Sequence, residues 1–120
     1  LLETQGDIKK LTKEEKNLAK DAKNYMDRMY SRDIRIQDVA GILHVHPNYL
    51  STLFRREYDQ SPREYLRKVR MNQAKLLLAT TEYSISDISS DVGYTNPFQF
   101  SKVFKSCYGI SPTEYRNMRQ

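Results

Sequence analysis

An all-α fold is the structure that this sequence predicts. Apolar residues recur every three or four positions through almost the whole chain, and no segment alternates apolar and polar residues for long. Only four glycines and four prolines interrupt this spacing. The chain also repeats itself, because eight residues of 47–65 recur fifty positions later in 97–115, where chance would supply about one. We therefore predict seven helices that form two copies of one small unit.

The first predicted helix begins after Thr12 and ends near residue 30. Thr12 and Glu15 form a capping box, in which a hydroxyl and a carboxylate three positions later satisfy backbone N–H groups at the helix start. Residues 1–11 carry no comparable apolar stripe. We expect them to be a tether from an upstream domain that is missing from this sequence, which opens with Leu1.

A short helix is expected next, from Ile36 to Leu43, and a longer one from Pro47 to Tyr58. Proline favours the first position of a helix, where a backbone N–H has no partner to lose. A short helix, a tight turn and a second helix are typical of a helix-turn-helix unit. We assign the first such subdomain to residues 12–60.

The longest predicted helix opens at Ser61, where a second capping box is combined with proline at the first helical position. Its apolar spacing continues to about residue 79. We assign residues 61–80 to this linker helix. Its basic residues have two interpretations of equal weight, a solvated face or, for Arg70, a brace within the core.

The second copy of the unit is assigned to residues 81–120. Ser84 caps a short helix that ends near Gly93, and Pro97 starts the second longer helix. A last capping box at Ser111 begins the seventh helix. The copy is therefore expected to be a second helix-turn-helix subdomain.

The two copies differ at their turns. His44 stands where the second copy has Gly93, which leaves the geometry of the first turn open, and the second turn is one residue longer. Asp59 replaces Gly109 after the longer helix. This exchange is mild, because aspartate tolerates a left-handed backbone better than most residues.

Composition points to a polyanionic partner. The net charge is +5 and the isoelectric point is about 9.3, a balance that favours nucleic acid or an acidic membrane surface. The single cysteine, Cys107, excludes an intrachain disulfide and a cysteine-based zinc cluster, and we expect it to be buried within a helix. No apolar run could span a bilayer and no signal peptide is present, so a cytoplasmic protein is expected.

Catalytic and metal-binding chemistry finds no support in the sequence. His44 and His46 have no cysteine nearby and no convincing third ligand, and they are interpreted as turn and cap residues. No nucleophile–base pair, glycine-rich phosphate loop or carboxylate pair has a supporting context. We therefore predict no enzyme, no cofactor and no metal site.

Five segments of the second copy carry a specific pattern of caps, glycines and apolar residues. They are Ile85–Ile88, Gly93–Tyr94, Phe98–Lys105, Gly109–Pro112 and Tyr115–Arg116. The first half carries corresponding residues, namely Ala40, Tyr49–Ser51, Leu53–Phe54, Tyr65–Leu66, Arg70, Ala74 and Leu77. Together these residues closely resemble the signature of the AraC/XylS family of bacterial transcription regulators, over about residues 13–119.

The resemblance implies two helix-turn-helix units joined by a rigid helix. Each unit would place its second helix, about 47–58 and 97–107, in one of two successive major grooves of double-stranded DNA. The chain would then be the C-terminal DNA-binding domain of a transcription activator. RNA polymerase would be a partner, and a sensor or dimerisation domain would lie upstream.

The first turns of the two longer helices carry the candidate base contacts, because they lie outside the apolar stripe and match the family's positions. The predicted base contacts are Asn48, Ser51, Thr52, Phe98, Gln99 and Lys102. Phosphate contacts are expected one turn further on and where the two short helices begin. They are Arg55, Arg56, Lys105, Ile36 and Ser86.

Side-chain chemistry suggests what each base contact would read. Asn48 or Gln99 could pair with adenine, Lys102 with guanine, and Phe98 with a thymine methyl group. The plainer interpretation of the same residues is a solvated helix face. For the whole chain, the main alternative is a basic helical module that binds another protein, and a weaker one is the targeting domain of a DNA repair protein.

Overall fold

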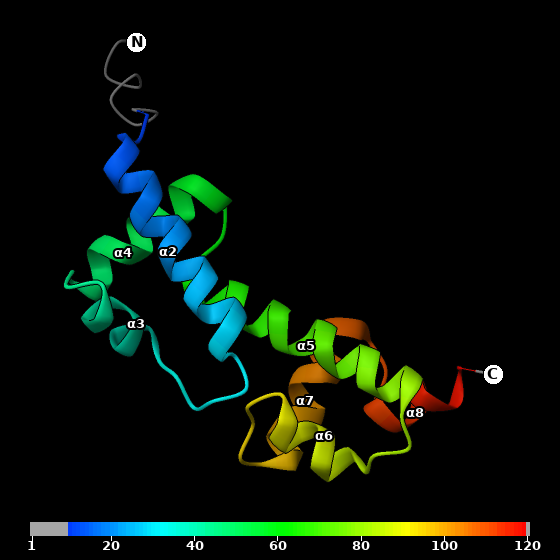
Figure 1. The fold of residues 1–120 in the computed structure, drawn as a ribbon. Coiled ribbons are helices and arrows are strands. Elements are labelled where there is room, and N and C mark those ends of the chain that lie inside the picture. The colour runs from blue at the N-terminus through cyan, green and yellow to red at the C-terminus, as the bar shows by residue number, and fades with distance from the viewer. Residues whose placement is uncertain (1–9, 120) are drawn as a thin grey trace.

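Seven α-helices and no strand make up residues 10–119, which are the residues that the computed structural model describes (Figure 1). The predicted fold class is confirmed. Most of the expected tether falls on residues 1–9, which lie outside the described residues. The helices are α2 (Lys13–Met29), α3 (Ile36–Ile42), α4 (Pro47–Tyr58), α5 (Pro62–Thr80), α6 (Ile85–Asp91), α7 (Pro97–Tyr108) and α8 (Pro112–Asn117).

Local sequence determines where the helices begin. The predicted capping boxes at Thr12, Ser61 and Ser111 are all formed, and each hydroxyl accepts the backbone N–H three residues further on. Proline lies in the first turn of α4, α5, α7 and α8. Helix α3 begins differently, because the Asp38 carboxylate accepts the backbone N–H of Arg35 at 2.9 Å.

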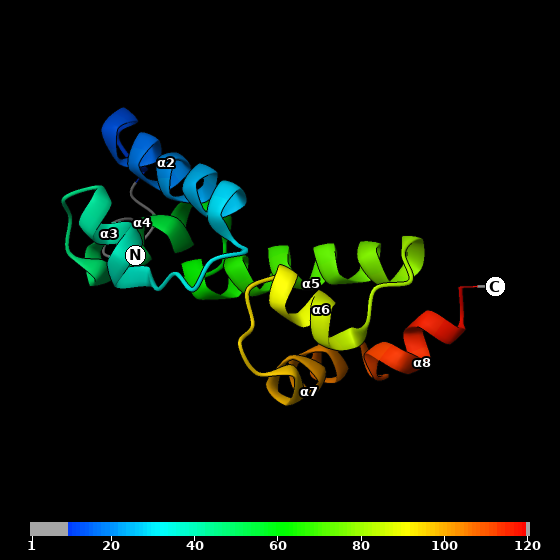
Figure 2. The same cartoon turned by 60° about the horizontal axis from the view of Figure 1, so that its bottom comes forward.

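Two separate apolar cores hold these helices together. The first core consists of Ala22, Met26, Val39, Ala40, Leu50, Phe54 and Leu66. The second consists of Met71, Ala74, Leu78, Ile88, Val92, Phe100 and Phe104. Helix α5 contributes to both cores, so it joins a first unit (α2, α3 and α4) at one end to a second unit (α6, α7 and α8) at the other (Figure 2).

The residues that repeat in the sequence form the same aromatic cluster in both units. In the first, the ring centroid of Phe54 lies 4.8 Å from that of Tyr58 and 5.7 Å from that of Tyr65. In the second, Phe104 lies 4.8 Å from Tyr108 and 5.7 Å from Tyr115. Tilted ring pairs at such distances are stabilising beyond the area that they bury. The repeat therefore encodes a repeated core.

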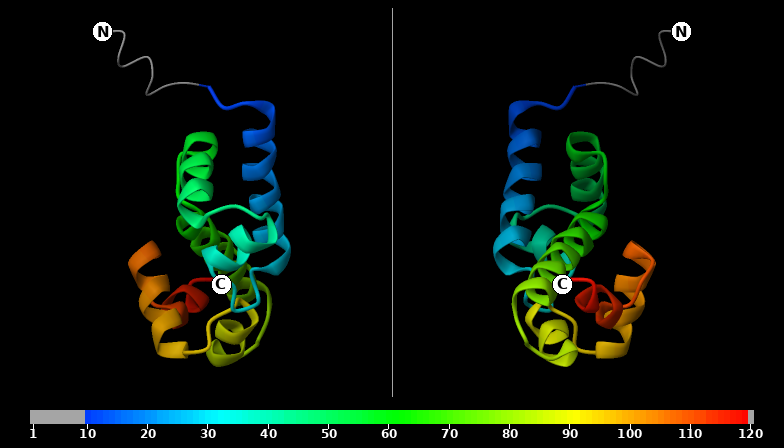
Figure 3. Two further views of the ribbon diagram at one scale, coloured as in Figure 1. Left: turned by 90° about the vertical axis from the view of Figure 1, so that its left-hand side faces the viewer. Right: turned by 90° about the vertical axis from the view of Figure 1, so that its right-hand side faces the viewer.

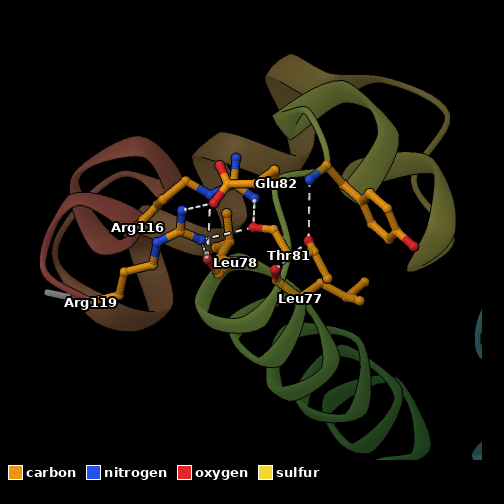
Figure 4. A network of polar contacts seen from close by, with 7 residues as sticks. Leu77, Leu78, Thr81, Glu82, Arg116 and Arg119 are labelled. Carbon is orange, nitrogen blue, oxygen red and sulfur yellow. Dashed lines mark hydrogen bonds and ion pairs between the residues drawn. The ribbon is translucent and has the colours of Figure 1, made fainter.

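Two arginines from the end of the chain close the C-terminal end of α5 (Figure 4). Arg116 Nε donates to the carbonyl oxygen of Leu78 at 3.3 Å, and Arg119 Nη1 donates to that of Thr81 at 2.8 Å. Arg119 Nη2 also pairs with the Glu82 carboxylate. The last carbonyl groups of a helix lack intrahelical partners, so these donors stabilise the helix end. They also hold the last helix against the linker.

Cys107 is exposed, and the prediction that it is buried was wrong. The inner stripe of α7 passes through Phe100 and Phe104, and the ring of Tyr108 continues it. Cys107 instead borders a cleft that Arg55 also lines. The helical period predicted the buried positions Phe100 and Phe104 correctly, but at the last turn Tyr108 contacts Asn72 and Lys75 of α5 while Cys107 stays exposed.

Leu76 is an apolar residue of α5 that is also exposed, by 55%. The buried stripe of α5 runs through Met71, Ala74 and Leu78. Leu76 is two residues from Ala74 and two from Leu78, and each such step is about 200° around a helix, so Leu76 lies on the opposite face.

Candidate DNA-binding surface

Helices α4 and α7 lie on the same side of the molecule, one in each unit (Figure 3). Their inward residues, Leu50, Phe54, Phe100 and Phe104, are fully buried. Burial of this stripe fixes the rotation of each helix about its own axis. The residues before and between the buried positions are therefore turned away from the core on each helix.

The first turn of α4 carries three of the predicted base contacts. Asn48 and Thr52 are exposed, whereas Ser51 is only half-buried and lies beside the core rather than fully outside it. The Thr52 hydroxyl donates to the Asn48 carbonyl oxygen at 3.0 Å. His46 caps the helix, since its Nδ1 accepts the Asn48 backbone N–H at 3.1 Å, as the interpretation of this histidine as a cap residue predicted.

Tyr49 is an exposed residue of the same turn that the sequence analysis did not select. Its hydroxyl donates to the Glu15 carboxylate on α2 at 3.3 Å. Desolvation and the nearby Glu15 charge raise the pKa of Tyr49, so its hydroxyl keeps its proton and remains a donor. The fifty-residue repeat offered a signal for this position, because Tyr49 stands where α7 has the candidate contact Gln99.

The first turn of α7 carries the other three predicted base contacts. Phe98 is 85% exposed, and Gln99 and Lys102 are exposed beside it. Asn96 caps the helix, with its side-chain oxygen accepting the Phe98 N–H at 2.8 Å and the Gln99 N–H at 3.3 Å. A single exposed apolar side chain is common on protein surfaces. Phe98 is a candidate contact because it lies beside two other predicted base contacts, Gln99 and Lys102.

The predicted phosphate contacts lie further along the two helices. Arg55, Arg56 and Lys105 are all exposed. Arg55 forms an ion pair with Glu64 at 3.6 Å. The pKa of Glu64 lies below its ordinary value, chiefly because its carboxylate accepts a hydrogen bond from Ser61 and to a lesser degree because of Arg55. The carboxylate therefore competes with an incoming phosphate for Arg55.

The short helices provide the last two predicted phosphate contacts. Ile36 is the half-buried first residue of α3, and Ser86 is exposed in the first turn of α6. Each of these turns also contains a carboxylate, Asp38 in α3 and Asp87 in α6. A carboxylate already favours the positive end of the helix, so it weakens the attraction for a phosphate there.

A cleft of about 600 Å³ lies between the two units. Four arginines line it, namely Arg35, Arg63, Arg67 and Arg70. Its other lining residues include the predicted contacts Ile36 and Gln99, and none of the described lining residues is acidic. The cleft is thus a positively charged surface between the start of α3, the linker helix α5 and the candidate recognition helix α7, and it was not predicted as a site.

Metal-binding clusters and membrane-spanning helices are both absent from the described part of the chain. Residues 10–119 contain no group of three or more histidines, cysteines or carboxylates that could hold a metal ion. Within the same residues, no helix is both long and apolar enough to cross a membrane.

Known proteins resemble this chain over most of its length. A family model described as a helix-turn-helix domain matches residues 39–118. The lactose operon transcription activator of Staphylococcus xylosus is 40% identical over 96 residues, which are 80% of this chain and 34% of that protein. The chain thus spans about a third of the length of this curated relative.

Two solved structures share the fold. The C-terminal domain of AraT, a response regulator from Geobacillus stearothermophilus, is 36% identical with a TM-score of 0.84, and the match covers 86% of each chain. A transcriptional regulator from Chromobacterium violaceum, described as containing an AraC-type DNA-binding domain, is 26% identical with a TM-score of 0.77, over 87% of this chain and 93% of that one. The fold, with two helix-turn-helix units on one linker helix, and the similarity to these proteins lead to the same conclusion. The chain belongs to the AraC/XylS family of transcription regulators and carries its DNA-binding domain.

Proposed function

We propose that this chain recognises a non-palindromic site in double-stranded DNA by inserting α4 and α7 into two successive major grooves. The observation that carries the proposal is the placement of both helices on one side of the molecule, each with an exposed polar first turn. Major grooves on one face of B-DNA recur about every 34 Å. The two turns differ in sequence, so the two blocks of the site should differ as well.

Base contacts are assigned to the exposed residues of these turns. Lys102 would donate to guanine, Gln99 or Asn48 would pair with adenine, and the exposed ring of Phe98 would contact a thymine methyl group. Ser51 and Thr52 are short, and Thr52 already bonds the backbone of its own helix. The first unit should therefore discriminate less between sequences than the second.

Phosphate contacts are assigned to cations on the same side. Arg56 and Lys105 are exposed and form no ion pair within the described residues, and Arg55 would have to exchange Glu64 for a phosphate. Two exposed arginines of the cleft, Arg35 and Arg67, add charge where the DNA backbone would cross between the two grooves. Such contacts position a protein on DNA without specifying sequence. Ile36 and Ser86 remain weaker candidates because of their acidic neighbours.

The full-length protein is proposed to be a bacterial transcription activator that acts in the cytoplasm. The name of the Staphylococcus xylosus relative supports an activating role at an operon. Because the chain spans only part of its relatives, a sensor or dimerisation domain is proposed for the remainder, and RNA polymerase as a partner. The subdomain boundaries at residues 12–60, 61–80 and 81–120 are part of this proposal.

Selection of binding sites from random duplex DNA tests the proposal. The expected product is a non-palindromic site with two blocks one helical turn apart. Enrichment of no sequence would contradict it and would favour the alternative, a basic helical module that binds another protein. Enrichment of a single block would show that only one unit recognises bases.

A further inference from the structure

We propose that Arg70 fixes the relative orientation of the two units and thereby selects the spacing between the two DNA blocks. Arg70 lies in the middle of α5, between the two cores, and is half-buried. The inference rests on the proposed function, because it names the residue that holds the two recognition helices at the distance set by the two DNA blocks.

Arg70 is bonded to the first unit by two hydrogen bonds. Its Nε donates to the carbonyl oxygen of Tyr30 at 2.9 Å, and its Nη2 donates to that of Arg32 at 2.8 Å. Tyr30 ends α2, and Arg32 lies in the connection to α3. Hydrogen bonds from a charged donor are among the stronger ones, and two from one planar group fix direction as well as distance.

The same guanidinium contacts the second unit. Its central carbon lies 5.6 Å from the ring centroid of Tyr94, which follows the turn between α6 and α7. The Tyr94 ring packs in turn against Phe100 on α7, at 5.7 Å between centroids. Arg70 therefore connects the end of α2 to the recognition helix of the second unit through the ring of Tyr94.

The two units also meet without any side chain between them. A Cβ atom on Gly93 would lie 2.5 Å from the carbonyl oxygen of Tyr30 and 2.9 Å from Arg70 Nε. Only glycine allows this approach, and the side chain of Tyr30 packs against both cores. Tyr30, Arg70, Gly93 and Tyr94 form one junction, which we call the inter-unit junction.

Within the inter-unit junction, Arg70 lies outside both cores. Each core is complete without Arg70, and helix α5 runs through both. Removal of the Arg70 contacts should leave each unit folded but free to rotate against the other about the linker. One base pair of B-DNA corresponds to about 3.4 Å and about 35° of rotation, so a small rotation is enough to change the preferred spacing.

The test compares spacing preference in Arg70→Gln, Arg70→Lys and the control Arg63→Gln. Arg63 is an exposed arginine of the same helix and cleft, so its replacement removes the same charge without touching the inter-unit junction. Affinities are measured for the selected site, for sites with one base pair added or removed between the blocks, and for a duplex with the second block alone. Residual dipolar couplings of the free chain report the orientation of the two units.

In the unsubstituted chain and in Arg63→Gln, a change of one base pair should weaken binding by about tenfold or more. In Arg70→Gln this penalty should fall to about threefold or less, while affinity for the second block alone stays unchanged. The dipolar couplings of each unit should still fit its own structure but no longer fit one common orientation. Arg70→Lys should lie between the two, because lysine keeps the charge without the planar fork that bonds both carbonyls.

An Arg70→Gln chain with the original spacing penalty, or with one common orientation of its units, would overturn the proposal. An equal loss of affinity for all duplexes would also overturn it, because Arg70 would then be a DNA contact. If Arg70→Gln did not fold, the Arg70→Lys chain would decide by the same criteria. Failure of the unsubstituted chain to select any DNA would instead refute the proposed function, and the dipolar couplings would still test the inter-unit junction.

Discussion

The two helix-turn-helix units share their interior and differ on the surface of their longer helices. The aromatic clusters around Phe54 and Phe104 have the same centroid distances, 4.8 and 5.7 Å. Both longer helices end at a left-handed residue, Asp59 with φ 60° and Gly109 with φ 83°. The residues that repeat in the sequence therefore build one structure twice, and the residues that do not repeat lie mainly on the surface.

The turns show why a repeat can be imperfect. His44 adopts φ 60° and Gly93 φ 100°, so both turns use a left-handed residue at this point. This resolves the geometry that the sequence left open. His44 is exposed and has room for its side chain, whereas Gly93 packs against Tyr30 of the other unit. The second turn requires glycine because of the inter-unit junction, and not because of the turn alone.

The two recognition helices differ in how many of their N-terminal side chains form hydrogen bonds or ion pairs within the protein. In α4, Tyr49 bonds Glu15 and Thr52 bonds its own helix. In α7, no hydrogen bond or ion pair within the described residues occupies the side chain of Lys102. A long side chain without a hydrogen-bond partner in the protein can reach a base edge and form a hydrogen bond there. The comparison thus predicts a more selective second unit.

Replacement of the two left-handed turn residues, Gly93 and His44, should give the largest difference between the two units, measured as loss of stability. Gly93→Ala should lower the free energy of unfolding by about 2–4 kcal/mol, because it adds both a left-handed alanine and a clash with the Tyr30 carbonyl. His44→Ala should cost less than about 1 kcal/mol, because the position is exposed and already holds a side chain. Urea denaturation measures both. Equal costs would refute the role of the inter-unit junction.

Truncation of one base-contact candidate in each unit should sharpen the difference in selectivity. Lys102→Ala should weaken binding to the selected site by about 1–3 kcal/mol and relax one base position. Thr52→Ala should cost less than about 1 kcal/mol, because the short hydroxyl bonds its own helix. Titration of duplexes substituted at single positions provides the measurement. An equal loss on every sequence would instead make Lys102 a phosphate contact.

The equivalent helix caps Ser61 and Ser111 should contribute unequally to the free energy of unfolding. Ser61→Ala should destabilise the chain by about 1 kcal/mol, because Ser61 caps α5, which contributes to both cores. Ser111→Ala should cost about half as much, since it caps the short terminal helix α8, which can open locally. Thermal denaturation followed by circular dichroism compares them. A larger loss for Ser111→Ala would contradict the central place of α5.

The stability that the carboxylates of the same capping boxes contribute depends on pH, and the lowered pKa values give the direction. Hydrogen bonds from Ser61 and Ser111 lower the pKa of Glu64 and Glu114 in the folded chain. A lowered pKa contributes stability above the ordinary pKa of the carboxyl, and this is lost as the pH falls through the folded value. In acid, the variants Glu64→Gln and Glu114→Gln should therefore approach the unsubstituted chain in stability, whereas Ser61→Ala and Ser111→Ala keep the backbone N–H that is the main cause of the lowered pKa. A difference that grew toward acid would refute the capping role.

The smallest expected difference between the units concerns the salt dependence of DNA affinity. Lys105→Ala should reduce the slope of log K against log salt by about 1, uniformly over all sequences. Arg55→Ala should also flatten this slope, but less, because Glu64 already pairs with Arg55 at 3.6 Å. Lys105 lies near the equivalent Glu114 without an ion pair within the described residues. Unchanged slopes in both variants would remove these residues from the phosphate contacts.

Features encoded locally could be predicted from the sequence. The caps at Thr12, Ser61 and Ser111, the proline-started helices and the tolerance of Asp59 for a left-handed backbone all depend on residues within one turn. The repeat then predicted two units of one fold. The inward faces of α4 and α7 followed from helical periodicity alone, apart from Cys107.

Contacts between residues far apart in the sequence were missed, although a brace was one of the two interpretations given for Arg70. Arg70 contacts Tyr30 across 40 residues, and Tyr49 contacts Glu15 across 34, so no local pattern could identify either partner. Cys107 shows the same limit, because periodicity does not tell whether another element covers a side chain. The basic cleft likewise exists only once both units are in place.

An exchange of recognition residues tests most directly the claim that the units share a frame and differ in what they read. The variant Asn48→Phe, Tyr49→Gln, Thr52→Lys gives the first turn of α4 the side chains of α7. Site selection from random duplex DNA, beside the unsubstituted chain, should then yield two copies of the second block at the original spacing. An unchanged first block would contradict the account, because those three residues would then not determine which bases the first unit recognises.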